Sequence, residues 1–182
     1  MNFITSEGEY PQFNKAGDRV YYQTGGYLFG ALSKSLKSVN LQGFDERTIF
    51  TSKYADRFVL SPDNQWVMYN ELFKVYLAPL PEAGVPIELS ANTKAIPVSL
   101  LTKDAGINLH WSGDSKRIHW TLGPAYFTAE IKNRFTFLPG SPDSVKGPDT
   151  IGTDIGLELQ TDKPKGKIAF TNATIITMRG DE

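Results

Sequence analysis

Two histidines are the residues whose types and spacing could carry chemistry in this chain. His110 and His119 flank a turn-forming run at residues 112–115, and the segments on both sides alternate like strands. A hairpin that turns at Asp114 and Ser115 places the two imidazoles directly opposite each other, with Cβ atoms about 4.5–5.5 Å apart. Imidazoles at that separation could share a metal ion or a proton.

A purely structural role is the competing interpretation of the same pair. Two polar aromatic side chains on one sheet face can pack beside tryptophans and bond to backbone groups. A zinc-type site needs at least a third protein ligand, and the spacing supplies no obvious carboxylate. A hairpin register shifted by one residue would also separate the rings. His110 and His119 are therefore candidate metal ligands, while no catalytic residue and no cofactor of this chain is predicted.

The elements that must position these histidines belong to a ten-residue pattern that the chain repeats. The copies cover residues 13–22, 60–69 and 111–120. Each copy has the composition of a strand, a turn and a second strand. Self-similarity at a period of about 40–50 residues, with mostly strand signals, predicts stacked units of the β-propeller type.

Turn and packing positions follow from the same pattern. Pro62 presets φ for a turn, and Asp63 and Asp114 can accept bonds from the backbone a couple of residues on. With Gly113, these residues are predicted to be structural rather than catalytic. Large aromatic residues recur at equivalent strand positions and are predicted to pack between blades, a ligand platform being the alternative. They are Trp66, Tyr69, Trp111 and Trp120.

The predicted fold class is all-β, because strand signals continue between the copies and give about four strands per repeat. Residues 1–138 are predicted to form a partial β-propeller of about three four-stranded blades. Residues 139–166 are rich in proline and glycine and predict a linker with one strand, at residues 155–159, where apolar residues alternate. Residues 167–182 alternate again and predict an extra strand that opens a following domain.

Composition excludes several classes of function. With 19 basic and 20 acidic residues the net charge is −1, so no general field favours nucleic acid. The chain has no cysteine, which excludes thiol catalysis and disulfide scaffolds. No apolar run approaches the roughly 18 residues that span a bilayer. Hydrophobic residues make up 40% of the chain, which suits a globular domain with a sizeable core.

A family resemblance rests on the repeated turns and on the end of the chain. The Ser61-Pro62-Asp63 turn with its flanking apolar strands resembles the repeat of TolB-like propellers. Residues 108–124 look like the last blade of bacterial proteins in which such a propeller precedes an amidohydrolase domain. Residues 171–182 are similar to the first strand of that domain. The resemblance thus covers the C-terminal part of a propeller and one further strand.

The resemblance implies a parent protein that is a metal-dependent hydrolase of amide-type bonds, with a divalent metal such as zinc in its barrel. The His-x-His signature of amidohydrolases occurs nowhere in this chain, so no family catalysis is carried over to its residues. The first hypothesis is a non-catalytic interaction or scaffold fragment. The alternative is a segment that contributes to hydrolase activity, or that carries its own metal site at His110 and His119.

The incomplete ring indicates which partners this chain could have. Three blades cannot close a propeller, and we expect their two outer faces to be exposed and apolar. Either a second copy or the missing half of the parent propeller would cover them, with protein, carbohydrate, peptide or another small molecule as possible ligands. The resemblance also implies a periplasmic or exported protein, although residues 1–9 show no signal-peptide pattern.

Overall fold

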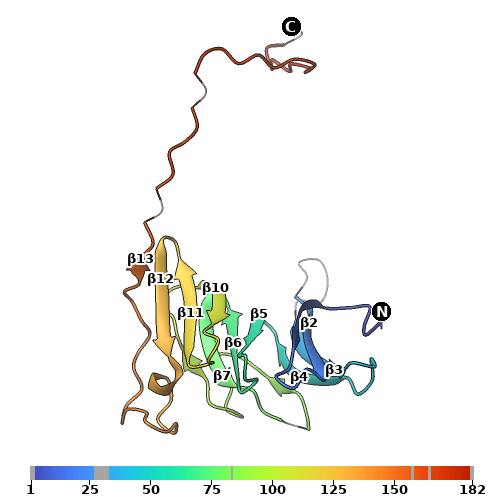
Figure 1. Cartoon of the computed structure of the whole chain (residues 1–182), viewed down its shortest axis with the longest axis vertical. Coiled ribbons are helices and arrows are strands. Elements are labelled where there is room, and N and C mark those ends of the chain that lie inside the picture. Colours follow the sequence, from blue (N-terminus) through green and yellow to red (C-terminus); the bar gives the residue numbers. More distant parts are fainter. Residues whose placement is uncertain (1–2, 27–32, 83, 157, 164, 181–182) are drawn as a thin grey trace.

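The chain folds into three consecutive β-sheets, an all-β architecture consistent with a partial β-propeller (Figure 1). The computed structural model describes residues 3–26, 33–82, 84–156, 158–163 and 165–180. These residues contain no α-helix and a single turn of 3-10 helix, Ile131–Asn133. None of their helices is long and apolar enough to cross a membrane.

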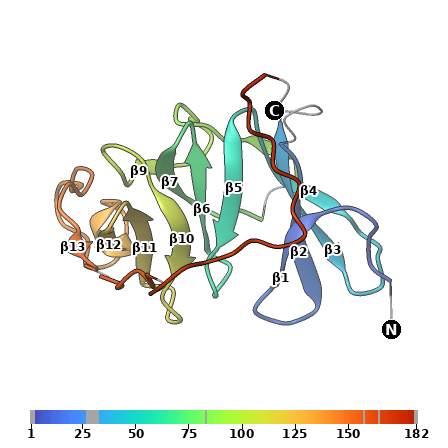
Figure 2. The ribbon, with the colours of Figure 1, turned by 90° about the horizontal axis from the view of Figure 1, so that it is seen from above.

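Each sheet is a blade whose strands pair antiparallel in chain order. The first blade contains β1 (Glu9–Phe13), β2 (Arg19–Gly25), β3 (Lys34–Asn40) and β4 (Arg47–Ser52). The second contains β5 (Ala55–Leu60), β6 (Trp66–Glu71), β7 (Lys74–Pro79) and β9 (Ser99–Leu100). The third contains β10 (Ile107–Trp111), β11 (Arg117–Leu122), β12 (Ala125–Glu130) and β13 (Thr153–Asp154). The three sheets stand side by side in this order (Figure 2).

One short strand crosses from the second blade to the first. β8 (Ile87–Glu88) lies in the connection between β7 and β9 and pairs in parallel with β4. Leu89, directly after it, is fully buried, and its backbone N–H donates to the carbonyl of Thr51 at 2.7 Å. The first sheet therefore has five strands, and its outer edge depends on a loop of the second blade.

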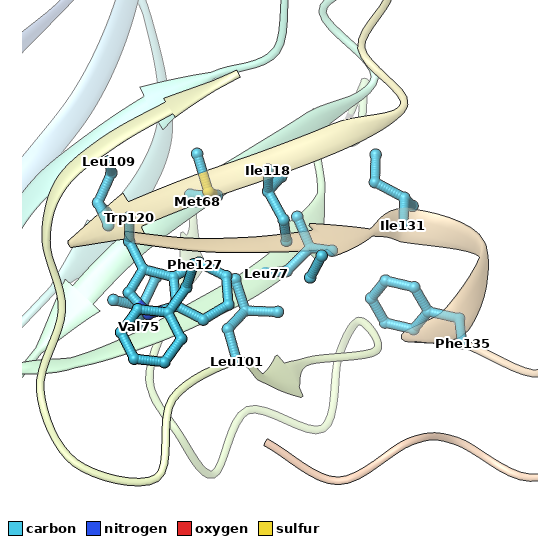
Figure 3. Close-up of a cluster of buried hydrophobic side chains, with 11 residues drawn as sticks. Met68, Val75, Leu77, Leu101, Leu109, Ile118, Trp120, Phe127, Ile131 and Phe135 are labelled. Carbon is cyan, nitrogen blue, oxygen red and sulfur yellow. The ribbon is translucent and has the colours of Figure 1, made fainter. Parts of the chain in front are cut away.

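Two apolar layers fill the spaces between neighbouring blades. Strand side chains alternate between the two faces of a sheet, so in β6 Tyr69 faces the first blade and Met68 faces the third. The layer between the second and third blades gathers Trp120, Phe127 and Leu77 around Met68 (Figure 3). Burying each such side chain contributes about 1.5–3 kcal/mol.

The two outer faces of the array differ from each other in how far they are exposed and apolar. On the first blade, Val20 and Tyr22 are buried and Ile4 of the N-terminal segment packs against them, but Phe13, the register partner of Val20, is 61% exposed. On the third blade, the strand positions that point away from the second blade hold mostly polar and aromatic residues. The prediction of an exposed apolar face is thus wrong for the third blade, because periodicity marks which side chains share a face, but not their polarity.

Polar side chains at equivalent repeat positions cross both interfaces between blades. Gln23 of β2 is buried; its Nε2 donates to the carbonyl of Phe58 at 2.7 Å, and its Oε1 accepts from the Phe58 N–H at 2.9 Å. Asn70 holds the same position in the second copy, and its Nδ2 donates to the carbonyl of Gly106 at 2.7 Å. Each of these amides points forward, toward the next blade in the chain.

The repeated turns also bond to one another, in the opposite direction. Gly17, Asn64 and Ser115 hold the same place in the three turns and have left-handed φ values of 74°, 56° and 59°. The side chain of Asn64 accepts from the backbone N–H of Lys15 at 2.5 Å, and that of Ser115 accepts from the N–H of Asp63 at 3.0 Å. Gly17 has no side chain with which to continue this series.

The segment predicted as a linker begins with residues held against the third blade. Arg134, 1% exposed, forms an ion pair with Asp149 and donates to the carbonyl of Gly147 at 3.1 Å. Lys146 contacts the second carboxylate oxygen of Asp149 at 2.6 Å. This charged cluster fixes the path of residues 139–149 before the chain reaches β13.

The strand of this segment lies earlier than the alternation of residues 155–159 suggested. β13 pairs with the start of β12, and Gly156, at a left-handed φ of 53°, follows the last bond, from the Ile155 N–H to the carbonyl of Pro124. Leu157 lies outside the described residues. The strand predicted at residues 155–159 is therefore replaced by one at Thr153–Asp154.

Residues 167–180 form no strand and extend away from the blades (Figure 1). Their apolar side chains are exposed, with Phe170 at 89% and Met178 at 88%. The strand predicted for residues 167–182 is thus not formed over the described part, since no neighbouring strand pairs with it there; residues 181–182 lie outside the description. That this segment opens an amidohydrolase-like domain stays a prediction.

Gln23→Ala should lower the free energy of unfolding by about 2–4 kcal/mol, because it leaves the buried N–H and carbonyl of Phe58 unpaired. Urea unfolding followed by tryptophan fluorescence measures this loss. Gln65→Ala is the matched control, because Gln65 is exposed and lies in a turn. Equal losses in the two variants would contradict the role given to Gln23.

Asp149→Asn should destabilise the protein by about 3–5 kcal/mol, because it leaves the buried guanidinium of Arg134 without its counter-charge. The same unfolding assay measures the effect, with Asp143→Asn, an exposed acid of the same segment, as the control. Replacing Arg134 and Asp149 together by leucine should cost less than Asp149→Asn alone. A larger loss in the double variant would contradict the buried-charge explanation.

Candidate functional site

The hairpin of β10 and β11 brings the two histidines together as predicted. His110 is the register partner of His119, and Trp111 is the partner of Ile118. The two imidazole rings stack, with centroids 5.0 Å apart and planes 18° from parallel. Both side chains lie on the face of the third blade that points away from the second.

Both nitrogens of His110 are engaged by neighbours in its own sheet. Its Nδ1 lies 2.8 Å from the carbonyl oxygen of Asn108, and its Nε2 lies 3.1 Å from the hydroxyl of Tyr126. A carbonyl only accepts, so Nδ1 carries the hydrogen, and in the neutral ring Nε2 accepts from the Tyr126 hydroxyl. The Tyr126 ring also packs on both imidazoles, 5.8 Å from His110 and 5.5 Å from His119.

His119 is half-buried and shares a hydrogen bond of 2.9 Å between its Nδ1 and the hydroxyl of Thr128. Burial lowers the pKa of His119, and the nearby His110 and Arg117 lower it further, because each disfavours a second positive charge. The neutral imidazole is therefore the favoured form of His119 near neutral pH.

The stacked arrangement does not fit a metal ion. Zn–N distances are about 2.0–2.1 Å, so two ligand nitrogens on one ion must lie within about 4 Å with both rings aimed at it. Here the rings lie face to face, and both nitrogens of His110 already have hydrogen-bond partners. Across the described ranges, no group of three or more His, Cys, Asp or Glu residues could hold a metal.

The aspartates of the repeated turns bond within those turns. The Asp63 carboxylate accepts from the Ser61 hydroxyl at 2.6 Å and from the Gln65 N–H at 3.1 Å. Asp114 repeats this pattern, accepting from the Ser112 hydroxyl at 2.5 Å and from the Lys116 N–H at 3.0 Å. These hydrogen bonds hold the pKa of Asp114 below its usual range. Pro62 and Gly113 each lie between the serine and the aspartate.

The four aromatic residues singled out in the repeats lie at blade interfaces. Tyr69 and Trp120 are fully buried in the two apolar layers. Trp111 donates through its indole N–H to the carbonyl of Val59 in β5, at 3.0 Å. Trp66 stacks on Phe135, with ring centroids 5.2 Å apart. None of the four forms an exposed aromatic platform.

Sequence reasoning missed the residues that surround the histidines. Tyr126 and Thr128 come from β12, and only the pairing of β11 with β12 places Thr128 opposite His119. Asn108 lies at an irregularity in the pairing of β10 with β11 and has a left-handed φ of 55°. Its Nδ2 donates to the Thr121 hydroxyl at 2.8 Å. The Asn-x-His spacing was the one signal that could have suggested a local bulge.

Comparisons with known proteins give no family assignment. No family model and no curated protein matches this sequence. Among solved structures, a chain described as "Crystal structure of the tricorn protease" is similar to 63% of this chain, at 10% identity and a TM-score of 0.38. This chain spans 11% of the length of that chain.

His110→Gln should raise the pKa of His119 toward its ordinary value, because it removes a like charge, while burial continues to lower it. NMR titration of the His119 ring protons measures this. A folded-state pKa below the unfolded value means that His119 favours the folded protein above about pH 6.5 and loses this contribution as the pH falls. The melting temperature should accordingly fall on acidification, and less so in His119→Gln. An unchanged His119 pKa in His110→Gln would contradict the coupling.

Proposed function

We propose that this chain is a non-catalytic β-propeller module with an interaction or scaffold role, part of a TolB-like propeller–amidohydrolase protein. The observation that carries the proposal is the outer face of the third blade. There His110, His119 and Tyr126 bond to their own sheet and remain accessible at its surface. Polar groups that are already satisfied lose little when a partner covers them, which suits reversible binding.

The parent protein proposed here follows from the resemblance of the repeats and of residues 171–182. It would be a metal-dependent hydrolase of amide-type bonds, exported to the periplasm, with a divalent metal such as zinc in a domain outside this chain. The blades described here would position that domain or dock its partners. Closure of the ring by the missing half of the parent propeller belongs to the same proposal; a second copy in that place is the alternative that the sequence left open.

The cross-strand pairing of His110 and His119 favours one second candidate, a chain that carries its own metal site and contributes to hydrolysis. The stacked rings, and the hydrogen bonds at both nitrogens of His110, favour the scaffold role instead.

Calorimetric titration of zinc into the protein separates the two functions. We expect no stoichiometric uptake, because binding would require His110 to lose the hydrogen bond of its Nε2 to Tyr126. A peptide amide carrying a chromogenic leaving group should remain uncleaved with zinc present. One-to-one zinc uptake that disappears in His110→Gln, together with amide cleavage, would overturn the scaffold function and favour the second candidate.

A further inference from the structure

The outer face of the third blade, here named the end face, can be compared with the faces that inner blades turn toward the next blade. Its polar and charged members are His110, Arg117, His119, Thr121, Tyr126, Thr128 and Glu130, and Ile107 lies beside Thr121 on the same face. In the second blade, the positions equivalent to His110, His119 and Thr128 hold Val59, Met68 and Leu77, which pack in the apolar layer against the third blade.

The polar side chains of the end face bond within their own sheet, whereas those of the first blade reach forward. Gln12 and Gln23 of the first blade donate to carbonyls of β5 in the second. Thr121 holds the position of Gln23 and Asn70, but its hydroxyl accepts from Asn108 of the same sheet. The end face therefore lacks the forward amide that crosses each of the two internal interfaces.

A second copy joined head to tail would also lack the backward bond between turns. That bond needs a side-chain acceptor at the left-handed turn position, and in the first blade this residue is Gly17. Contact between the end face and the first blade of another copy would thus miss both polar links. In addition, Ile4 already packs against the outer face of the first blade. The end face is suited to a partner other than a copy of this chain.

The charges of the end face indicate the chemistry of that partner. Arg117 is exposed and forms no ion pair among the described residues, although Glu130 is its register partner on β12. Glu130 instead pairs with Lys132 at 3.0 Å. Tyr126, Thr121 and Thr128 contribute hydroxyl groups. Protonation of the His119 ring, whose pKa burial holds below the ordinary histidine value, would add positive charge beside Arg117 at acidic pH.

We propose that the end face binds an acidic polypeptide segment, and that protonation of His110 and His119 strengthens this binding. The inference rests on the proposed interaction role of the module. A protonated His119 donates from both ring nitrogens, and Nδ1 is the one held by Thr128. A carboxylate beside the stacked rings would offset the repulsion between two imidazolium charges 5.0 Å apart, and the Arg117 guanidinium can bind a carboxylate through two bonds.

Fluorescence anisotropy with a labelled oligoglutamate peptide tests the proposal at constant ionic strength, near pH 5.5 and near pH 7.5. Oligoglutamate is largely ionised at both values, since the glutamate pKa is about 4.3. The affinity should be at least about fivefold higher at the lower pH. The double variant His110→Gln/His119→Gln should lose this pH dependence, and Arg117→Gln should weaken binding at both pH values.

Two controls accompany the measurement. Lys53→Gln removes an exposed positive charge from the connection between the first and second blades and should leave binding unchanged. An oligolysine peptide should show no binding. Glutamine retains hydrogen-bonding capacity at the histidine positions, and the melting temperature of each variant verifies that it is folded.

The proposal is overturned if oligoglutamate does not bind, or if binding and its pH dependence survive in the double histidine variant. It is also overturned if light scattering shows a dimer that the double variant abolishes, because the end face would then hold a second copy. These results would leave the non-catalytic role of the module standing. That role fails by a different result, zinc uptake accompanied by amide cleavage.

Discussion

The alternation of side chains along the second strand of each blade is the constraint on which the structure depends. In β6, Met68 and Tyr69 must both be buried, because the second blade has neighbours on both sides. In β11, Trp120 faces the second blade while His119 faces away from it. The same strand pattern therefore yields a core in the middle of the array and a polar surface at its end. One change of register in a hairpin would exchange these roles.

Hydrogen bonds give the array a direction as well as cohesion. The amides of Gln23 and Asn70 reach forward to the next blade, and the side chains of Asn64 and Ser115 reach back to the preceding turn. Because these groups are polar and specific in geometry, they select one arrangement of blades among many that would bury similar apolar area. Gly17 replaces the side-chain acceptor at the turn position of the first blade, and Thr121 replaces the amide at the forward position of the third blade. The two ends of the array are therefore chemically different.

Much of the fold could be predicted because local turn chemistry sets hairpin register. The turn at Asp114 and Ser115 was enough to place His110 opposite His119, and the three repeats were enough to indicate three blades. The neighbours of the histidines depend on β12 and on the irregular backbone at Asn108, which periodicity does not encode. Arg134 and Asp149 are separated by a loop in which hydrophobic residues do not alternate. Their ion pair therefore could not be predicted from the sequence.

The pairing of β8 with β4 has a consequence for synthesis of the chain on the ribosome. The first sheet gains its fifth strand, and Phe50 its neighbour Leu89, from residues that follow the whole of the β5–β7 meander. A nascent chain that has released the first blade alone cannot yet seal that blade's edge. The sheet of the first blade is therefore completed only once residues 87–89 have also emerged.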